Sequence, residues 1–188
     1  AEKVVDRVVA RLQVLDPERC FGACRTGEVP LPGARVDDPD RGGFRGFAKR
    51  VRTSALSTVD EGLVRHLLHR YGIAARELIA ALAGDPAAAR PLVSGLPYRR
   101  IEVTRAADTE MAVTLDDVLR RRVPVSFRHA DGGAEAAPDV GALMGAVLGW
   151  SPAETAEAVE RYRSGVVEER QRRGEPSAGL GLDSRRRA

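Results

Sequence analysis

Three of the five carboxylates in the stretch from residue 97 to residue 122 could in principle form an acid–base set, because paired carboxylates are the groups that general acid–base catalysis uses. Glu102 and Glu110 recur at helical spacing, a little over two turns apart, and Asp117 follows four residues before Arg121. Small or apolar side chains share the face of the two glutamates: Val103, Ala106 and Met111. No histidine or nucleophile accompanies these acids. We therefore expect them to fix helix packing by pairing with nearby arginines: Arg99, Arg100 and Arg121.

Two cysteines and two histidines have a spacing that suggests zinc. Cys20 and Cys24 fall within the usual range for zinc ligands, but His66 and His69 are closer together than the histidines of common zinc fingers. A long, irregular stretch also separates the two pairs. We expect no metal site. In this interpretation Cys24 packs between domains, and the two histidines lie on a solvated helix face.

Arginine dominates the basic residues, and several arginines cluster in the second half of the chain. They could form a surface for anionic lipid or nucleic acid: Arg120, Arg121, Arg122, Arg161, Arg163, Arg170, Arg172 and Arg173. The net charge is only +3, and aromatic residues, which would stack on bases, make up 4% of the chain. We expect a solvated helical face and no nucleic-acid partner. A stand-alone basic helical module that binds nucleic acid or a membrane surface, or acts as a scaffold, is kept as the alternative function.

Recognised catalytic motifs are absent from the sequence. No glycine-rich fingerprint follows a strand, and no Walker loop, Ser-His-Asp order or His-Glu-x-x-His motif occurs. By its own residues, this chain is expected to hold no catalytic or metal-binding residues.

The elements that carry these residues are predicted to be helices, packed as a compact all-α bundle. Residues 2–15 place valines and leucines on one stripe, and three prolines and five glycines make residues 20–43 an irregular connector. Residues 123–127 are β-prone, so at most a minor strand pair is expected. Capping signals open three helices: the 58–61 box, Thr114, and the box from Ser151 to Glu154. A chain with 43% hydrophobic residues can build the required core.

The order of motifs along the chain resembles a known family. The region from residue 97 to residue 122 resembles the C-terminal helical domain of FAD-dependent glycerol-3-phosphate dehydrogenases and alpha-glycerophosphate oxidases. The matching pieces are Pro97-Tyr98, Glu102-Val103, Glu110-Met111-Ala112 and the run 114–119 before the arginine cluster. Further pieces fit the same order: Cys24-Arg25-Thr26, Pro30 to Ala34, Arg70-Tyr71-Gly72 and Ala75-Arg76-Glu77. The resemblance covers roughly residues 1–162.

The resemblance implies a parent enzyme that oxidises sn-glycerol 3-phosphate to dihydroxyacetone phosphate by hydride transfer to FAD, with quinone or oxygen as the electron acceptor. It places the flavin domain upstream of this chain, so we expect the chain alone neither to bind FAD nor to turn over substrate. The residues that match the family signature are expected to be structural or to lie between domains: Cys24, Arg25, Thr26, Glu102, Glu110, Asp117 and Arg121. The domain would cap the flavin domain and help to form a homodimer.

These inferences divide the chain into four parts. Residues 1–19 form a helix that links to the flavin domain, 20–43 the connector, 44–172 the helical C-terminal domain and 173–188 a mobile tail. The chain begins without a methionine or signal peptide, so we expect it to be part of a longer cytoplasmic protein. The parent is expected to lie at the inner face of the cytoplasmic membrane as a peripheral protein.

Overall fold

The computed structural model describes residues 2–19, 21–22, 25, 27–29, 42–55 and 59–174. Within these residues the chain is helical, and its extended structure is limited to an isolated antiparallel bridge between Pro91 and Arg99. The all-α prediction is therefore confirmed. The α-helices are α1 (Glu2–Leu15), α2 (Gly43–Ala55), α3 (Glu61–Tyr71), α4 (Ala75–Gly84), α5 (Arg100–Thr109), α6 (Ala137–Leu148) and α7 (Pro152–Arg172). The shorter segments are η2 (Gly72–Ala74), η3 (Pro86–Ala89), η4 (Asp117–Arg122) and η5 (Val125–Phe127).

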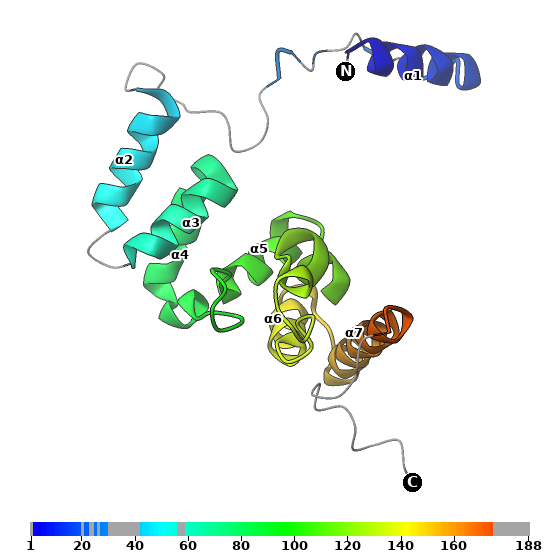
Figure 1. The fold of residues 1–188 in the computed structure, drawn as a ribbon. Helices are drawn as coiled ribbons and strands as arrows, with labels where there is room; N and C mark the ends of the chain where they lie inside the picture. Colours follow the sequence, from blue (N-terminus) through cyan, green and yellow to red (C-terminus); the bar gives the residue numbers. More distant parts are fainter. Residues whose placement is uncertain are drawn as a thin grey trace.

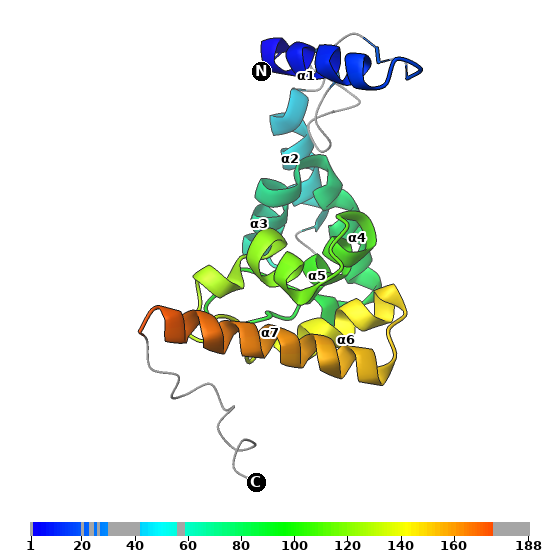
Figure 2. The ribbon, with the colours of Figure 1, turned by 90° about the vertical axis from the view of Figure 1, so that its right-hand side faces the viewer.

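The helices form two packed groups joined by α5 (Figure 1). Helices α2, α3 and α4 pack together, and α6 and α7 lie side by side along the base of the molecule in Figure 2. Helix α5 packs against α6 and lies between the two groups. Helix α1 stands apart from this bundle in Figure 1, and in Figure 2 it lies above α2.

Each group has its own hydrophobic core, and α5 contributes to both. The first core joins apolar faces of α2, α3 and α4, and Ile101 of α5 completes it. Its members on α3 are those that the periodicity predicts: Leu63, Val64, Leu67 and Leu68. The second core is built on Val103 and Ala106 of α5 and includes Leu119, Met144 and Tyr162. Opposite faces of α5 therefore contribute to different cores.

Close approach of α6 and α7 depends on two glycines. A Cβ atom added at Gly141 would lie 2.6 Å from Cγ2 of Val159, and one added at Gly145 would lie 2.8 Å from the hydroxyl oxygen of Thr155. Trp150 packs at the corner between the two helices, as predicted. The absence of side chains at these two positions lets the helix backbones approach closely.

Helix starts agree with the sequence signals in two cases and differ in one. Ser151 and Glu154 form the expected capping box of α7, with Pro152 at the first helical position. The hydroxyl of Thr114 accepts the N–H of Asp117 at 3.1 Å, as an N-cap does. Helix α3 is capped by Asp60, whose carboxylate accepts the N–H of Leu63 at 3.0 Å. Thr58, the expected first residue of that box, lies outside the described residues.

Two local structures differ from the expected ones. Residues 123–127, expected to be extended, contain the 3-10 helix η5, because Arg128 and His129 both donate their N–H groups to the carbonyl of Val125. The segment 117–122 is a π-helix, closed by a hydrogen bond from the N–H of Val123 to the carbonyl of Val118. A π-helix has hydrogen bonds between residues five apart, and π-helical turns are frequent at functional sites.

No helix in the described part of the chain combines the length and the apolar character needed to span a membrane.

Candidate functional site

The carboxylate of Glu102 is the centre of a buried polar cluster. Its side chain is in the first turn of α5 and is 0% exposed. One oxygen accepts the backbone N–H of Arg99 at 2.7 Å, which helps to begin the helix. Nε2 of His66 lies 3.0 Å from both carboxylate oxygens, and the hydroxyl of Tyr71 donates to Oε1 at 3.0 Å. Nε of Arg70 forms an ion pair with Oε1 at 3.1 Å.

Arg70 extends this cluster to the second core. Its guanidinium donates to the carbonyl oxygen of Arg122 at the end of η4. The same group lies over the rings of Tyr71 and Tyr98, with its central carbon 5.5 Å and 5.3 Å from the two ring centroids. Arg128 donates to the hydroxyl of Tyr98 at 2.9 Å. Helices α3 and α5 and the π-helix are therefore tied together through one arginine.

Burial, followed by the charge of Glu102, raises the pKa of the Tyr71 hydroxyl. Tyr71 therefore stays protonated and donates its hydrogen bond to Glu102. A buried carboxylate with several hydrogen-bond donors and one cation is a satisfied structural group, whereas a catalytic carboxylate must reach a substrate. The geometry therefore supports a packing role for Glu102, of the kind that the sequence predicts for these acids, but with a different arginine from those expected.

The histidine prediction is wrong for one of the two residues. His66 was expected on a solvated face, but its side chain is 13% exposed and bonded to Glu102, and its ring packs edge-on against Tyr98. His69 is exposed, as expected. One signal for the true role is present in the sequence, because His66 shares the face of α3 that carries the core residues Leu63 and Leu67.

Glu110 does not continue the helical face of Glu102. Helix α5 ends at Thr109, Glu110 caps it, and Met111 adopts a left-handed backbone with φ +58°. Met111 is 86% exposed, so its expected place beside the glutamates is wrong. Glu110 instead lies between two arginines: its carboxylate is 3.3 Å from Nε of Arg105 and 3.7 Å from Nε of Arg122. Arg122 also donates to the carbonyl of Glu110 at 2.9 Å.

Asp117 and Arg121 form the expected ion pair across one turn of η4. Asp117 also accepts the backbone N–H groups of Val113 and Thr114 and the Thr114 hydroxyl, at 3.2, 3.0 and 2.8 Å. Burial alone would raise the pKa of the Asp117 carboxyl, but these hydrogen bonds outweigh burial and lower it. Arg100, another expected partner of the acids, pairs with Asp139 of α6 at 2.9 Å.

The arginines that could have formed a basic surface are interspersed with acids. Arg120 pairs with Asp116 and Glu169 at 2.8 and 2.5 Å, and Arg161 pairs with Glu157 at 2.6 Å. Arg173 also pairs with Glu169. The continuous basic face that a nucleic-acid or membrane module would need is therefore not supported by these residues.

Most of the connector motif lies outside the described residues. Cys20, Cys24 and Thr26 are among the undescribed positions. The possible zinc site and the expected interdomain packing of Cys24 therefore lie outside the described residues. Arg25 is exposed and pairs with Glu28 at 3.2 Å. In the part of the chain that the structure describes, no three histidine, cysteine, aspartate or glutamate side chains are grouped to hold a metal ion.

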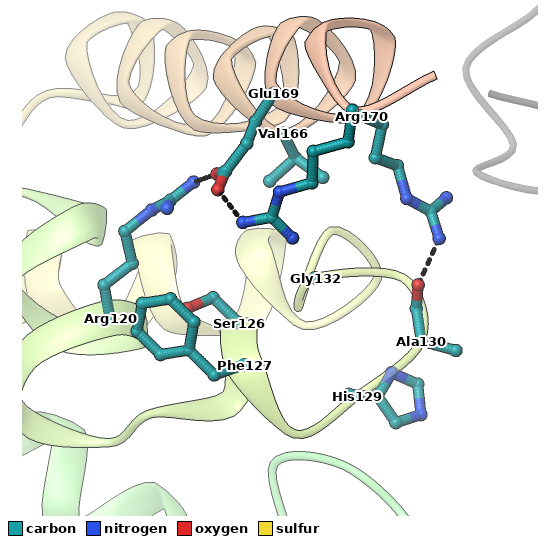
Figure 3. A pocket seen from close by; sticks show the side chains of 10 residues that line it. Arg120, Ser126, Phe127, His129, Ala130, Gly132, Val166, Glu169 and Arg170 are labelled. Atoms are coloured by element: carbon teal, nitrogen blue, oxygen red, sulfur yellow. Dashed lines mark hydrogen bonds and ion pairs between the residues drawn. The ribbon is translucent and has the colours of Figure 1, made fainter. Parts of the chain in front are cut away.

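An FAD site does not fit the described residues. A dinucleotide fold needs parallel strands and a glycine-rich turn before a helix, whereas extended structure in the described ranges is limited to the single bridge. A cavity beside α7 has a volume of about 210 Å³ (Figure 3). That is below the roughly 300 Å³ at which small-molecule pockets begin.

Comparison with known proteins gives the family. Residues 24–155 match the family model described as the C-terminal domain of alpha-glycerophosphate oxidase. This match covers more than half of the chain, which therefore belongs to that family of C-terminal domains. No solved structure matches the chain.

Several curated relatives are glycerol-3-phosphate dehydrogenases. The chain is 35% identical over 106 residues to glycerol-3-phosphate dehydrogenase 2 of Mycobacterium tuberculosis, covering 56% of this chain and 18% of that protein. It is 34% identical over 153 residues to a probable mitochondrial glycerol-3-phosphate dehydrogenase of Dictyostelium discoideum, covering 80% of this chain and 22% of that protein. The matched segment is thus about a fifth of these relatives, and it confirms the family that the sequence motifs resemble.

Proposed function

We propose that this chain is the C-terminal cap of an FAD-dependent glycerol-3-phosphate dehydrogenase. The parent would oxidise sn-glycerol 3-phosphate to dihydroxyacetone phosphate. The family match and the names of the relatives support this assignment. The flavin and the residues that touch substrate would belong to an upstream domain, since the described residues of this chain do not fit FAD.

The observation that carries the capping role is the apolar face of α1. Val4, Val8 and Leu12 lie on one side of this helix and are 64%, 52% and 41% exposed. Helix α1 stands apart from the other helices in Figure 1, and the exposed fractions show that this face is not covered. A helix with an apolar stripe is stable in water when another surface buries the stripe. We infer that the upstream flavin domain is that surface.

The parent enzyme would act as a homodimer and pass electrons to a membrane quinone. It would lie in the cytoplasm as a peripheral protein at the inner face of the membrane. A dimer would also offer the apolar stripe of α1 a second possible surface, which the experiment below distinguishes from the flavin domain.

The test uses the full-length parent enzyme with the double substitution Val8→Asp and Leu12→Asp. Two carboxylates on the stripe should separate the cap from the flavin domain, because unpaired charges in an apolar contact are costly. We expect limited proteolysis to release the cap faster than in the unchanged enzyme. Val14→Asp is the matched control, because Val14 is 68% exposed but lies off the stripe by helical spacing.

Equal proteolysis of the double variant and the Val14→Asp control would contradict docking through this stripe. Sedimentation of the 188-residue chain alone tests the second surface. If that chain forms a dimer that the double substitution abolishes, a second copy rather than the flavin domain covers α1. FAD that binds stoichiometrically to the 188-residue chain would overturn the placement of the flavin upstream.

A further inference from the structure

The cavity beside α7 lies outside the Glu102 cluster and is lined by polar groups from three elements (Figure 3). Arg120 reaches it from η4, Ser126 from η5, and Arg170 and Arg173 from the C-terminal end of α7 and the residue after it. Glu169 lies in the wall between these arginines. The cavity volume of about 210 Å³ is several times the roughly 30 Å³ that a water molecule occupies.

Positive charge dominates this lining. Three guanidinium groups face a single carboxylate, that of Glu169, which pairs with both Arg120 and Arg173. Arg120 has a second carboxylate partner, Asp116, at 2.8 Å from its Nε atom. Arg170 donates to the carbonyl oxygen of Ala130, which holds the loop after η5 against α7. The hydrogen bond from Arg120, together with the charges of the neighbouring arginines, lowers the pKa of the Glu169 carboxyl.

Ser126 adds an unsatisfied donor to the same cavity. Its hydroxyl oxygen is buried and finds no hydrogen-bond partner among the described residues. A buried hydroxyl without a partner costs free energy, so this group favours a ligand that accepts a hydrogen bond. Ser126 and Arg120 come from the neighbouring elements η5 and η4, and Arg170 and Arg173 come from the α7 side, so donors reach the cavity from more than one direction (Figure 3). A tetrahedral oxyanion presents acceptor oxygens in several directions.

We propose that this cavity binds a phosphate dianion. Guanidinium groups match phosphate oxygens in geometry and charge, and the cavity admits an ion of this size but not a whole nucleotide. Glu169 forms ion pairs with Arg120 and Arg173, so it competes with phosphate for these two guanidinium groups. The proposal concerns only residues of this domain and is independent of the flavin chemistry of the parent.

The competing role of Glu169 gives the proposal two predictions of opposite sign. Glu169→Gln removes the internal carboxylate while it keeps the shape of the side chain, so phosphate should bind about three- to tenfold more tightly. Arg173→Gln removes one guanidinium at an exposed helix end, so phosphate should bind about threefold more weakly. Ser126→Ala should also weaken binding, by about threefold, because it removes the free donor.

Matched controls are available on the same helix. Arg161 and Glu157 form an ion pair of the same four-residue spacing as Arg173 and Glu169, at 2.6 Å, and neither lines the cavity. Arg161→Gln and Glu157→Gln change the charge of the chain by the same amounts as the two test substitutions. They should leave phosphate affinity unchanged.

The experiment is calorimetric titration of the 188-residue chain with inorganic phosphate at neutral pH and constant ionic strength, with thermal unfolding of each variant as the test of folding. We expect saturable binding of phosphate, which Glu169→Gln tightens and Arg173→Gln weakens.

The proposal would be overturned if no saturable binding occurred. It would also be overturned if Arg161→Gln weakened binding as much as Arg173→Gln. Acetate that binds as tightly as phosphate, with the same response to the variants, would overturn the phosphate assignment. If the Arg173→Gln variant fails to fold, the phosphate affinity of the Ser126→Ala variant tests the proposal in its place.

Discussion

Nε2 of His66 lies 3.0 Å from both carboxylate oxygens of Glu102, although 36 residues separate the two in the sequence. This contact joins α3 to α5 inside the fold. It also places on the core-facing side of α3 a polar ring that was expected on a solvated face. The packing of α3 against α5 therefore includes a polar contact between side chains that are distant in the sequence.

Glu102→Gln should strongly destabilise the domain. The amide keeps the shape of the side chain but leaves Arg70 partly buried without its anion, and loss of one partner of a buried ion pair costs about 3–5 kcal/mol. Urea unfolding of the 188-residue chain measures the change in the free energy of unfolding. Glu77→Gln is the control, since Glu77 is 77% exposed and 3.9 Å from Arg105. Equal effects of the two substitutions would contradict the central role of Glu102.

His66→Ala and His69→Ala should differ, although both residues lie on α3. Loss of the His66 ring removes a hydrogen bond to a buried carboxylate, which should lower the free energy of unfolding by about 1–3 kcal/mol. His69 is exposed, so its removal should change stability by less than about 0.5 kcal/mol. The same urea titration compares them. A larger effect at His69 would show that the assigned contact is wrong.

Gly141→Ala and Gly165→Ala should have opposite effects. At Gly141 the new methyl group would clash with Val159 across the contact of α6 and α7, and overpacking of this kind costs about 1–3 kcal/mol. At Gly165 a Cβ atom meets nothing within 4 Å, so alanine in the middle of α7 should stabilise by about 0.4–1 kcal/mol. Thermal unfolding of both variants shows directly whether each substitution raises or lowers the unfolding temperature. Destabilisation by both would argue against this packing.

Asp131 should make stability depend on acidic pH. Burial opposes its ionisation, but hydrogen bonds from His129 and from the N–H groups of Glu135 and Gly133 outweigh burial and hold the pKa of the Asp131 carboxyl below its ordinary value of 3.8. A group whose pKa is lowered by folding contributes stability above the unfolded pKa and loses it as the pH falls through the folded pKa. Asp131→Asn should therefore destabilise at neutral pH, by about 1–2 kcal/mol.

The difference between Asp131→Asn and the unchanged chain should shrink as the pH falls below 3.8. Urea unfolding at a series of pH values measures it. Asp108→Asn serves as the control, because Asp108 is exposed on α5. A difference that stays constant across this range would contradict the assigned role of the Asp131 carboxylate.

Local signals in the sequence predict much of this fold. The apolar periodicity of residues 2–15 and 61–71, the Ser151 capping box and the four-residue spacing of Asp117 and Arg121 all lie within one helix, and the structure contains each of them. Interactions of this kind depend on neighbours a turn apart, which a sequence displays directly.

Tertiary contacts and helix ends were predicted less well. Glu102 was expected to pair with an arginine close in sequence, but its cation is Arg70, on another helix. Spacing within one helix carries no information on which distant side chain will be brought to it. Helix α5 likewise ends at Thr109, two residues before the Met111 that its pattern includes, and Met111 adopts a left-handed conformation before η4. The domain boundaries and the roles of Cys24 and Thr26 remain predictions.

The division of α5 between two cores has a consequence for how the domain unfolds. Ile101 is buried in one core, and Val103, two residues later, is buried in the other. Neither core can lose its packing without disturbing the same helix. The two groups of helices should therefore behave as one cooperative unit, and the amide hydrogens of α5 should be among the slowest in the chain to exchange with solvent, since they are released only by global unfolding.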